Sequence, residues 1–213
     1  MTYVMSDIHG EIERFEKMLE LIEFSEQDQL YIIGDVVDRA PDGVRLLLNI
    51  MNRPNITMVL GNHEQMMLDT FARDSYPEAR LLWAQNGGNV TRRELLYRRT
   101  SADRNSIMRF CRGLPTQIDV TVGEKTYRLV HGHPSDKELD RIWGRVTPES
   151  KFPGANYIVG HTPTCYLTGV FNQPYTIFRG EGFIDIDCGC GNMTNPFRRL
   201  ACLRLDDEKE FYV

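Results

Sequence analysis

The stretch ITMVLGNHE, residues Ile56–Glu64, decides the fold because it joins an apolar strand directly to a cluster of polar side chains. Its first part, Ile56–Leu60, has the composition of a buried strand. A glycine, an amide, an imidazole and a carboxylate follow at once in Gly61–Glu64. A simple turn needs no such combination, so we interpret this strand end as part of a functional site.

Two earlier strand-like segments end in the same way. Thr2–Met5 is followed by SDIHG at Ser6–Gly10, and Gln29–Ile33 is followed by GDVVDR at Gly34–Arg39. The segments between these strands have apolar residues at helical spacing, and a β-α-β-α-β order with short connections predicts parallel strands. Parallel strands bring their carboxyl ends to one edge of a sheet. We therefore expect five side chains to lie close together there: Asp7, His9, Asp35, Asn62 and His63.

The histidines point to a metal site at this edge. The chain has five of them, and all adjoin such clusters at strand ends: His9, His63, His131, His133 and His161. Carboxylates gathered at one edge repel one another, and a bound cation relieves the repulsion while it accepts imidazole nitrogens. No cysteine lies in these clusters, which argues against zinc in a thiolate cage. The donors are enough for two ions bridged by a carboxylate and a solvent oxygen, which suits in-line displacement at phosphorus.

The rest of the chain divides into a helical part and a mostly β part. Helical patterns from about residue 64 to residue 113 predict a cap or side wall to the cleft. The segment after Thr116 has the alternation of two strands joined at Gly123-Glu124, and further strand patterns follow it. No repeat or linker interrupts the sequence, so we predict that residues 1–213 form a single domain.

Composition narrows the class of protein. The formal net charge of −5 gives no general attraction to nucleic acid or to an anionic membrane. Five cysteines without framework spacing favour a reducing compartment. Acids at Asp7 and Glu11 leave no room for the apolar core of a signal peptide, and no apolar run reaches membrane length. We therefore predict a cytoplasmic protein with no nucleic-acid or membrane partner.

Taken together, the motifs resemble those of the metallophosphoesterase superfamily, and more closely the bacterial and bacteriophage-lambda type of the phosphoprotein phosphatase family. The counterparts keep the family's order: Asp7–Gly10, Gly34–Arg39, Gly61–Glu64, His131-Gly132 and Gly160–Thr162. The segments NGG at Asn86–Gly88, IWGR at Ile142–Arg145 and the late FIDIDCGCGNMT are also similar to that type. The resemblance implies an α/β (α+β four-layer) architecture. In this calcineurin-like metallophosphoesterase fold, two mixed β-sheets pack as a sandwich and are flanked by helices.

The resemblance also implies two divalent metal ions. Mn²⁺ is the first choice, and Fe or Zn also suits these oxygen and nitrogen ligands. The first ion would be held by Asp7, His9 and Asp35, with Asp35 bridging, and the second would be completed by Asn62, His131 and His161.

Four further residues receive catalytic roles from the resemblance. A water or hydroxide bridging the metals would attack phosphorus directly, without a covalent phosphoenzyme. His63 would protonate the leaving oxygen, and Asp38 would orient His63. Arg39 and Arg145 would grip the phosphoryl oxygens, a role that suits the guanidinium fork.

These roles predict a metal-dependent phosphatase, a hydrolase of phosphomonoesters. The favoured function is a serine/threonine or dual-specificity protein phosphatase, acting on a phosphoprotein or a small phosphorylated substrate. The alternative is a symmetrical diadenosine tetraphosphate hydrolase, because DRAPDG at Asp38–Gly43 resembles the second motif of those enzymes equally well. A non-catalytic metal-binding scaffold is disfavoured, since every ligand position is kept. The sequence leaves the natural substrate, the metal pair and the oligomeric state open.

Five positions raise separate questions. Ser6 and Ala40 stand where the family usually has glycine, and we expect Ser6 to be tolerated and Ala40 to shift Arg39 slightly. His133 follows His131-Gly132 and either contacts substrate or faces solvent. Cys188 and Cys190 are expected to pack at a strand end rather than to bind metal.

Overall fold

The computed structural model describes residues 1–213, and its strands form two five-stranded sheets. The first sheet has the order β10-β9-β1-β2-β3, with β1 (Thr2–Met5), β2 (Gln29–Ile32), β3 (Ile56–Met58), β9 (Ala201–Arg204) and β10 (Glu210–Tyr212). The second has the order β4-β5-β6-β8-β7, with β4 (Gln117–Val122), β5 (Lys125–Val130), β6 (Tyr157–Val159), β7 (Phe178–Gly180) and β8 (Phe183–Asp185).

Both sheets are mixed. The strands β1, β2 and β3 are parallel, as their sequence order predicts, and β9 and β10 add antiparallel pairs. In the second sheet β5, β6 and β8 are parallel, while β4 and β7 run antiparallel to their neighbours. The predicted hairpin is present: Val122 pairs with Lys125 across a two-residue loop in which Gly123 has a φ of 61°.

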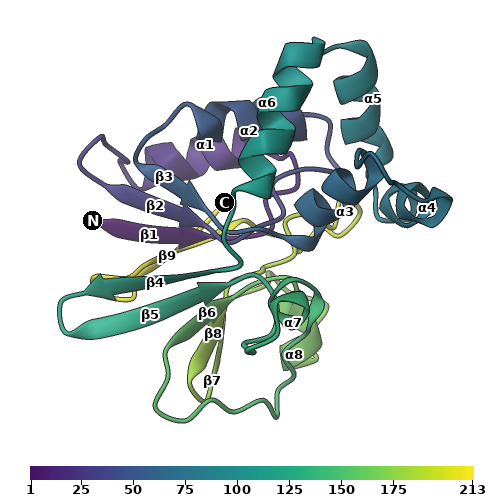
Figure 1. Cartoon of the computed structure of the whole chain (residues 1–213). Helices are drawn as coiled ribbons and strands as arrows, with labels where there is room; N and C mark the ends of the chain where they lie inside the picture. The colour runs from purple at the N-terminus through teal and green to yellow at the C-terminus, as the bar shows by residue number, and fades with distance from the viewer.

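Helices cover the outer sides of the two sheets (Figure 1). Two of them, α1 (Ile12–Leu21) and α2 (Gly43–Met51), lie over the first sheet, and α7 (Glu138–Trp143) and α8 (Thr164–Thr168) lie beside the second. The segment between the sheets in sequence is helical, with α3 (Asn62–Thr70), α4 (Pro77–Gln85), α5 (Asn89–Tyr97) and α6 (Ser101–Arg112). None of the helices has the length and apolar character that a membrane-spanning segment needs.

Alternating side chains of β1 build two separate cores. Tyr3 and Met5 belong to a cluster of 30 buried residues that the first sheet shares with its helices. Val4 belongs to a cluster of 15 that also contains Leu129 and Ile158 of the second sheet. Because successive side chains of a strand point to opposite faces, one strand stabilises the sheet–sheet and the sheet–helix interfaces together. The predicted sandwich with flanking helices is confirmed.

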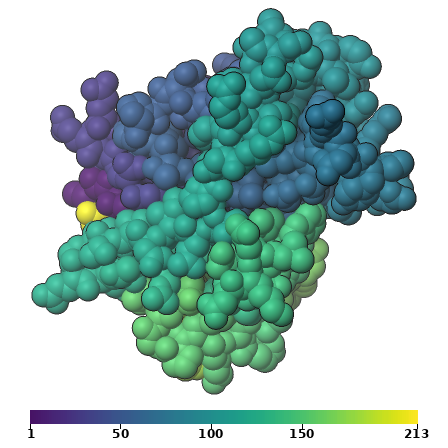
Figure 2. Space-filling model, in the orientation of Figure 1, coloured from purple at the N-terminus to yellow at the C-terminus, as the bar shows by residue number.

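In the space-filling view, the purple and blue segments form the upper part of the molecule and the green segments the lower part (Figure 2). The teal segment that contains the β4–β5 hairpin runs along the boundary between them. The loops after β1, β2 and β3 come from the upper part, whereas the loops after β5 and β6 come from the lower part. Side chains from both parts can therefore meet at the carboxyl ends of the parallel strands.

Candidate active site

The loops after β1 and β2 are held together by backbone hydrogen bonds. The N–H groups of Asp7, His9 and Gly10 donate to carbonyls of residues 34–36 at 3.2, 2.9 and 2.8 Å. A Cβ on Gly61, at the end of β3, would lie 2.3 Å from Asp35 Oδ1, so glycine is required for the third loop to approach. The three motifs found in the sequence therefore converge at one sheet edge.

The backbone of this region adopts an uncommon conformation. Left-handed φ values cost a non-glycine residue about 1–2 kcal/mol, and such residues concentrate at functional sites. Six of the eight non-glycine residues with positive φ are candidate site residues: Asp7 (51°), His9 (49°), Asp35 (56°), Asp38 (74°), Arg39 (66°) and His161 (66°).

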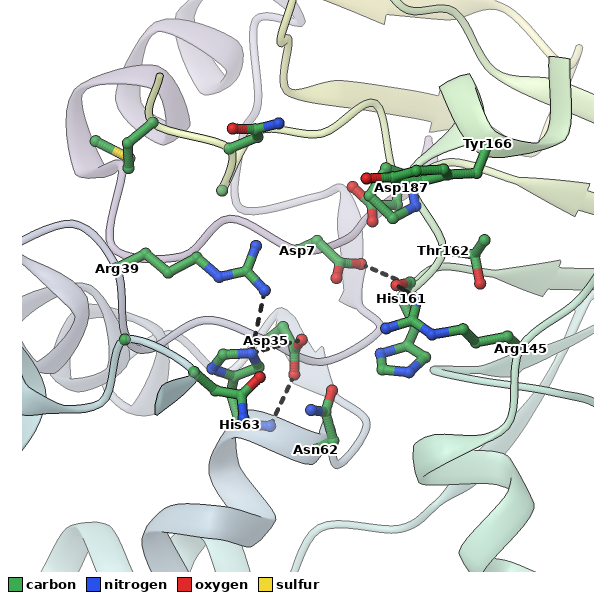
Figure 3. Close-up of a pocket in the computed structure, with 16 residues that line it drawn as sticks. Asp7, Asp35, Arg39, Asn62, His63, Arg145, His161, Thr162, Tyr166 and Asp187 are labelled. Carbon is green, nitrogen blue, oxygen red and sulfur yellow. Dashed lines mark hydrogen bonds and ion pairs between the residues drawn. The ribbon is translucent and has the colours of Figure 1, made fainter. Parts of the chain in front are cut away.

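A cavity of about 820 Å³ opens at this edge (Figure 3). Seven of the ten predicted site residues line it: Asp7, Asp35, Arg39, Asn62, His63, Arg145 and His161. The other three, His9, Asp38 and His131, are buried and contact the lining residues from behind. The structure thus brings all ten together, although they span residues 7–161 of the chain.

Asp35 lies at the centre of the candidate metal ligands. Its Oδ2 atom is 3.7 Å from Nε2 of His9, and its Oδ1 atom is 3.4 Å from Nε2 of His131. Burial disfavours the charged carboxylate, but the imidazoles of His131 and His63 hold the pKa of Asp35 well below its usual range. Its two oxygens face different histidine groups, which is the disposition that a bridging ligand needs.

The buried histidines His9 and His131 turn Nε2 toward the other candidate ligands. Nδ1 of His9 lies 3.0 Å from the carbonyl of Val37, and Nδ1 of His131 lies 2.8 Å from the carbonyl of Ile33. A carbonyl only accepts, so each Nδ1 carries a hydrogen and each Nε2 is the nitrogen that faces the other candidate ligands. Nε2 of His131 donates to Asn62 Oδ1 at 3.0 Å. Burial lowers the pKa of His131, but the Asp35 carboxylate outweighs it and raises the pKa to about 10, so a bound cation would have to displace this proton.

The donor set fits a pair of metal ions. Two groups of three donors each lie within 4.8 Å of one another, His9–Asp35–His63 and Asp35–His131–His161. Asp7 adds an oxygen 3.9 Å from His9 Nε2, while its other oxygen accepts from the backbone N–H of His161 at 3.0 Å. Pairs of these candidate ligand atoms lie 3.4–3.9 Å apart. Two atoms that each lie about 2.1 Å from the same ion have separations of this size.

His63 meets the distance criterion for a ligand, but its surroundings favour another role. Its Nδ1 donates to Asp38 Oδ2 at 2.7 Å, and its Nε2 lies 3.3 Å from a nitrogen of the Arg39 guanidinium. A fixed positive charge at that distance opposes metal binding by Nε2. Burial lowers the pKa of His63, but the Asp35 and Asp38 carboxylates outweigh burial and raise it above its usual value.

Two arginines reach toward the cavity from opposite sides (Figure 3). Arg39 extends from the loop after β2, and Arg145 follows α7 in the second half of the chain. Arg145 is anchored by a hydrogen bond from Nη1 to the carbonyl of His161 at 2.7 Å. Guanidinium groups on two sides of a cavity can bind the oxygens of one phosphoryl group between them.

Glu64 has a structural role that its motif did not reveal. It is the third residue of α3, and its buried carboxylate accepts from the N–H of Gly61 at the start of that helix and also binds another loop. It accepts from the N–H groups of Asp35 at 2.9 Å, Val36 at 2.9 Å and Val37 at 3.2 Å. Burial, then the Asp35 charge, raises the pKa of Glu64 to about 7. Glu64 therefore holds the loop that carries Asp35.

The structure shows the surroundings of the five positions that the sequence left open. Ser6 is buried and its hydroxyl donates to Asp7, so the departure from glycine adds a contact to a candidate ligand. Ala40 has no positive φ, because the left-handed residues are the preceding Asp38 and Arg39. His133 packs edge-on against Phe152, away from the cavity lining. Both late cysteines, Cys188 and Cys190, are free and buried.

Comparison with known proteins agrees with this geometry. A family model described as calcineurin-like phosphoesterase matches residues 2–192. The chain is 32% identical over 175 residues to serine/threonine-protein phosphatase 1 of Salmonella typhimurium, a match that covers 76% of this chain and 78% of that protein. It is 41% identical over 73 residues to the symmetrical bis(5'-nucleosyl)-tetraphosphatase of Wigglesworthia glossinidia brevipalpis, covering 33% of this chain and 27% of that protein.

The fold is shared with solved structures. A serine/threonine phosphatase from Saccharomyces cerevisiae superposes with a TM-score of 0.62 at 13% identity, covering 100% of this chain and 78% of that one. The chain belongs to the calcineurin-like phosphoesterase family, in which a pair of metal ions assists the hydrolysis of phosphate esters. It is a metal-dependent phosphatase.

Proposed function

We propose that this phosphatase hydrolyses phosphomonoesters, with phosphoserine and phosphothreonine in proteins as its first substrate class and phosphotyrosine as a second. The observation that supports this most directly is the pair of arginines, Arg39 and Arg145, on two sides of the cavity beside His63. The similarity to a serine/threonine phosphatase over 76% of this chain supports the same substrate class.

Six side chains are proposed as the metal ligands. Asp7, His9 and Asp35 would hold one divalent ion, and Asp35, Asn62, His131 and His161 the other. Mn²⁺ is the first candidate for both positions, with Fe and Zn as alternatives. When bound, the ion pair would activate water for attack and screen the charge of the phosphoryl group.

The remaining residues act on the substrate itself. Arg39 and Arg145 bind phosphoryl oxygens and orient the ester for in-line attack. The attacking water loses one proton to solvent as its oxygen forms a bond to phosphorus, while the bond to the leaving oxygen breaks and its electron pair stays on that oxygen. His63 supplies the proton to the leaving oxygen through Nε2, and Asp38 stabilises the imidazole by accepting from Nδ1 at 2.7 Å.

Substrate binding prepares His63 for this step. Without substrate, Nε2 of His63 and the Arg39 guanidinium are 3.3 Å apart. A guanidinium binds phosphoryl oxygens more strongly than it binds an imidazole nitrogen. Arg39 is therefore drawn to the phosphate, and Nε2 becomes free to carry the proton.

A symmetrical diadenosine tetraphosphate hydrolase is the second candidate. The cavity of about 820 Å³ is larger than a phosphoserine requires, and Tyr166 and Met193 add exposed apolar surface to its lining. The local similarity to the tetraphosphatases points the same way. That similarity covers only 27% of the relative's length, so we rank this function second.

Side-by-side turnover tests the two candidates. A phosphoserine peptide, a phosphotyrosine peptide and diadenosine tetraphosphate are assayed with Mn²⁺, Fe²⁺ or Zn²⁺ added. The proposal expects release of inorganic phosphate from the phosphopeptides with the highest kcat/KM. A higher kcat/KM for diadenosine tetraphosphate would transfer the assignment to the second candidate. Stoichiometric metal binding without hydrolysis of any of these compounds would indicate a scaffold.

We also propose where the protein acts, which partners it has and how its chain is organised. We place the protein in the cytoplasm, where phosphoproteins or small phosphorylated compounds are its partners, and assign it no nucleic-acid or membrane partner. Residues 1–213 are treated as one catalytic domain, with the helical segment at about 64–113 as a cap or side wall. The turn between α4 and α5, which contributes Asn86 and Gly87 to the cavity lining, supports this role for the helical segment.

A further inference from the structure

The indole of Trp83 makes a contact that the roles above do not use. Its Nε1 donates to Oδ2 of Asp38 at 2.7 Å, and the same oxygen accepts from Nδ1 of His63 at 2.7 Å. Trp83 is 1% exposed and Asp38 is 0% exposed. The other carboxylate oxygen, Oδ1, has no hydrogen-bond partner. Two donors on one oxygen fix the carboxylate plane, so the indole determines which oxygen faces His63.

The turn between α4 and α5 locks this indole in place. A Cβ on Gly88 would lie 2.3 Å from Cδ1 of Trp83, so the backbone of the turn packs directly on the indole. The carbonyl of Gly87 accepts from the backbone N–H of Arg39 at 3.3 Å. The glycines of the NGG motif thus have a physical purpose, because each allows the turn to approach either the indole or Arg39.

A second contact from α5 holds the backbone of Asp38. The hydroxyl of Thr91, which is 2% exposed, accepts from the N–H of Asp38 at 3.0 Å. Asp38 and Arg39 both have left-handed backbones, with φ values of 74° and 66°. Such a pair persists only where the surrounding structure holds it, and here the support comes from a segment about 50 residues further along the chain.

We propose that Trp83 is a positioning residue that acts through Asp38 to keep His63 oriented for proton donation to the leaving group. The α4–α5 segment is then part of the catalytic machinery as well as a wall of the cleft. This inference rests on the proposed role of His63.

The dependence of the rate on the leaving group tests the proposal. An alkoxide leaving group needs a proton, whereas the more acidic phenol of p-nitrophenyl phosphate needs it much less. Trp83→Phe keeps the ring and removes the donor. In the metal-loaded full chain we expect it to lower kcat about tenfold for a phosphoserine peptide and less than about threefold for p-nitrophenyl phosphate. Trp143→Phe makes the same chemical change at the other tryptophan, and we expect no selective loss.

A double-mutant cycle separates positioning from a general effect on structure. If Trp83 acts only through Asp38, Trp83→Phe should change kcat little in a chain that already carries Asp38→Ala. Equal losses on both substrates, or a further tenfold loss in the Asp38→Ala background, would overturn the proposal.

A spectroscopic measurement gives a readout that is independent of turnover. In the Zn²⁺-loaded chain, the Trp83 indole N–H signal is identified by its loss in Trp83→Phe. We expect Asp38→Ala to shift this signal upfield and to speed its exchange with solvent, with the Trp143 signal unchanged. An unshifted signal would contradict the contact while leaving the proposed phosphatase function intact. An inactive wild-type chain would overturn the proposed function and the proton-donation role together.

Discussion

The carboxylate of Glu64 accepts a hydrogen bond from the backbone N–H of Asp35, with Oε2 and the nitrogen 2.9 Å apart. Both residues are buried, and they belong to different motifs of the sequence. Asp35 is the proposed bridging ligand, so the shape of its loop decides where both carboxylate oxygens point. Glu64 links the third motif to the second by binding that loop.

Glu64→Gln should therefore destabilise the fold and weaken metal binding. Glutamine keeps one acceptor oxygen, but its NH₂ group would face two backbone N–H donors. We expect a loss of about 2–4 kcal/mol in the free energy of unfolding, because charged hydrogen bonds in a buried network are broken. Thermal unfolding and Mn²⁺ titration measure the two effects. Glu16→Gln on the exposed face of α1 is the matched control, and equal behaviour of the two variants would contradict this role.

His63→Asn should reduce turnover and leave metal binding intact. Removal of a general acid costs about 100-fold or more in kcat. The measurements are kcat for a phosphoserine peptide and the metal content of the purified protein. Loss of one metal ion per chain would instead place His63 in the coordination shell, as the group His9–Asp35–His63 would allow.

Metal removal should lower the unfolding temperature. A ligand that binds only the folded state, at 100 times its Kd, stabilises it by about 2.7 kcal/mol. For a chain of this size that corresponds to a Tm shift of about 5–10 °C between Mn²⁺ and a chelator. Asp35→Asn should abolish most of this shift, whereas Asp119→Asn on the exposed face of β4 should preserve it. A full shift in Asp35→Asn would show that Asp35 is not a shared ligand.

A pH-dependent contribution to stability is expected far from the cavity, at Glu208. This carboxylate binds Lys125 and lies 2.5 Å from Arg179, and the Lys125 contact followed by the Arg179 contact keeps its pKa below the ordinary value of 4.5. A lowered pKa means that the folded state favours the carboxylate. The stabilisation is therefore complete above about pH 4.5 and is lost as the pH falls through the folded-state pKa.

The variant Glu208→Gln tests the direction of this pH dependence of stability. At pH 7 we expect a loss of about 0.5–1 kcal/mol, since the group is partly exposed. The difference in Tm from the wild type should shrink as the pH is lowered below 4.5. Glu149→Gln, an exposed carboxylate without an ion pair, is the control. A difference that stays constant with pH would contradict the prediction.

Much of the fold could be read from local patterns. Helical spacing in residues 12–22 and strand-like runs at residues 2–5, 29–33 and 56–60 predicted parallel strands, and β1, β2 and β3 are parallel. The boundaries were less certain: the third strand ends at Met58, although the N–H of Val59 still donates to Ile32 at 2.8 Å. The spacing of apolar residues and the turn residues reflect interactions between near neighbours in the sequence. They therefore predict that a helix or strand exists better than they predict its first and last residues.

The grouping of the site residues followed from topology, because parallel strands must deliver their carboxyl ends to one edge. The topology did not predict which residues hold the site in place. Trp83 contacts Asp38 across 45 residues, and Glu64 contacts the Asp35 loop across 29. No local pattern in either segment identifies its partner, and the residue type of Arg39 does not predict its left-handed backbone.

By itself, then, the sequence determined which elements form, that three of them run parallel, and which side chains meet where they end. Only the tertiary structure decided how those side chains are held, through Glu64 of α3 and Trp83 of α4. The reason is physical: periodicity is a short-range property of the chain, whereas a hydrogen bond between distant segments exists only after packing has placed its donor and acceptor within 3 Å.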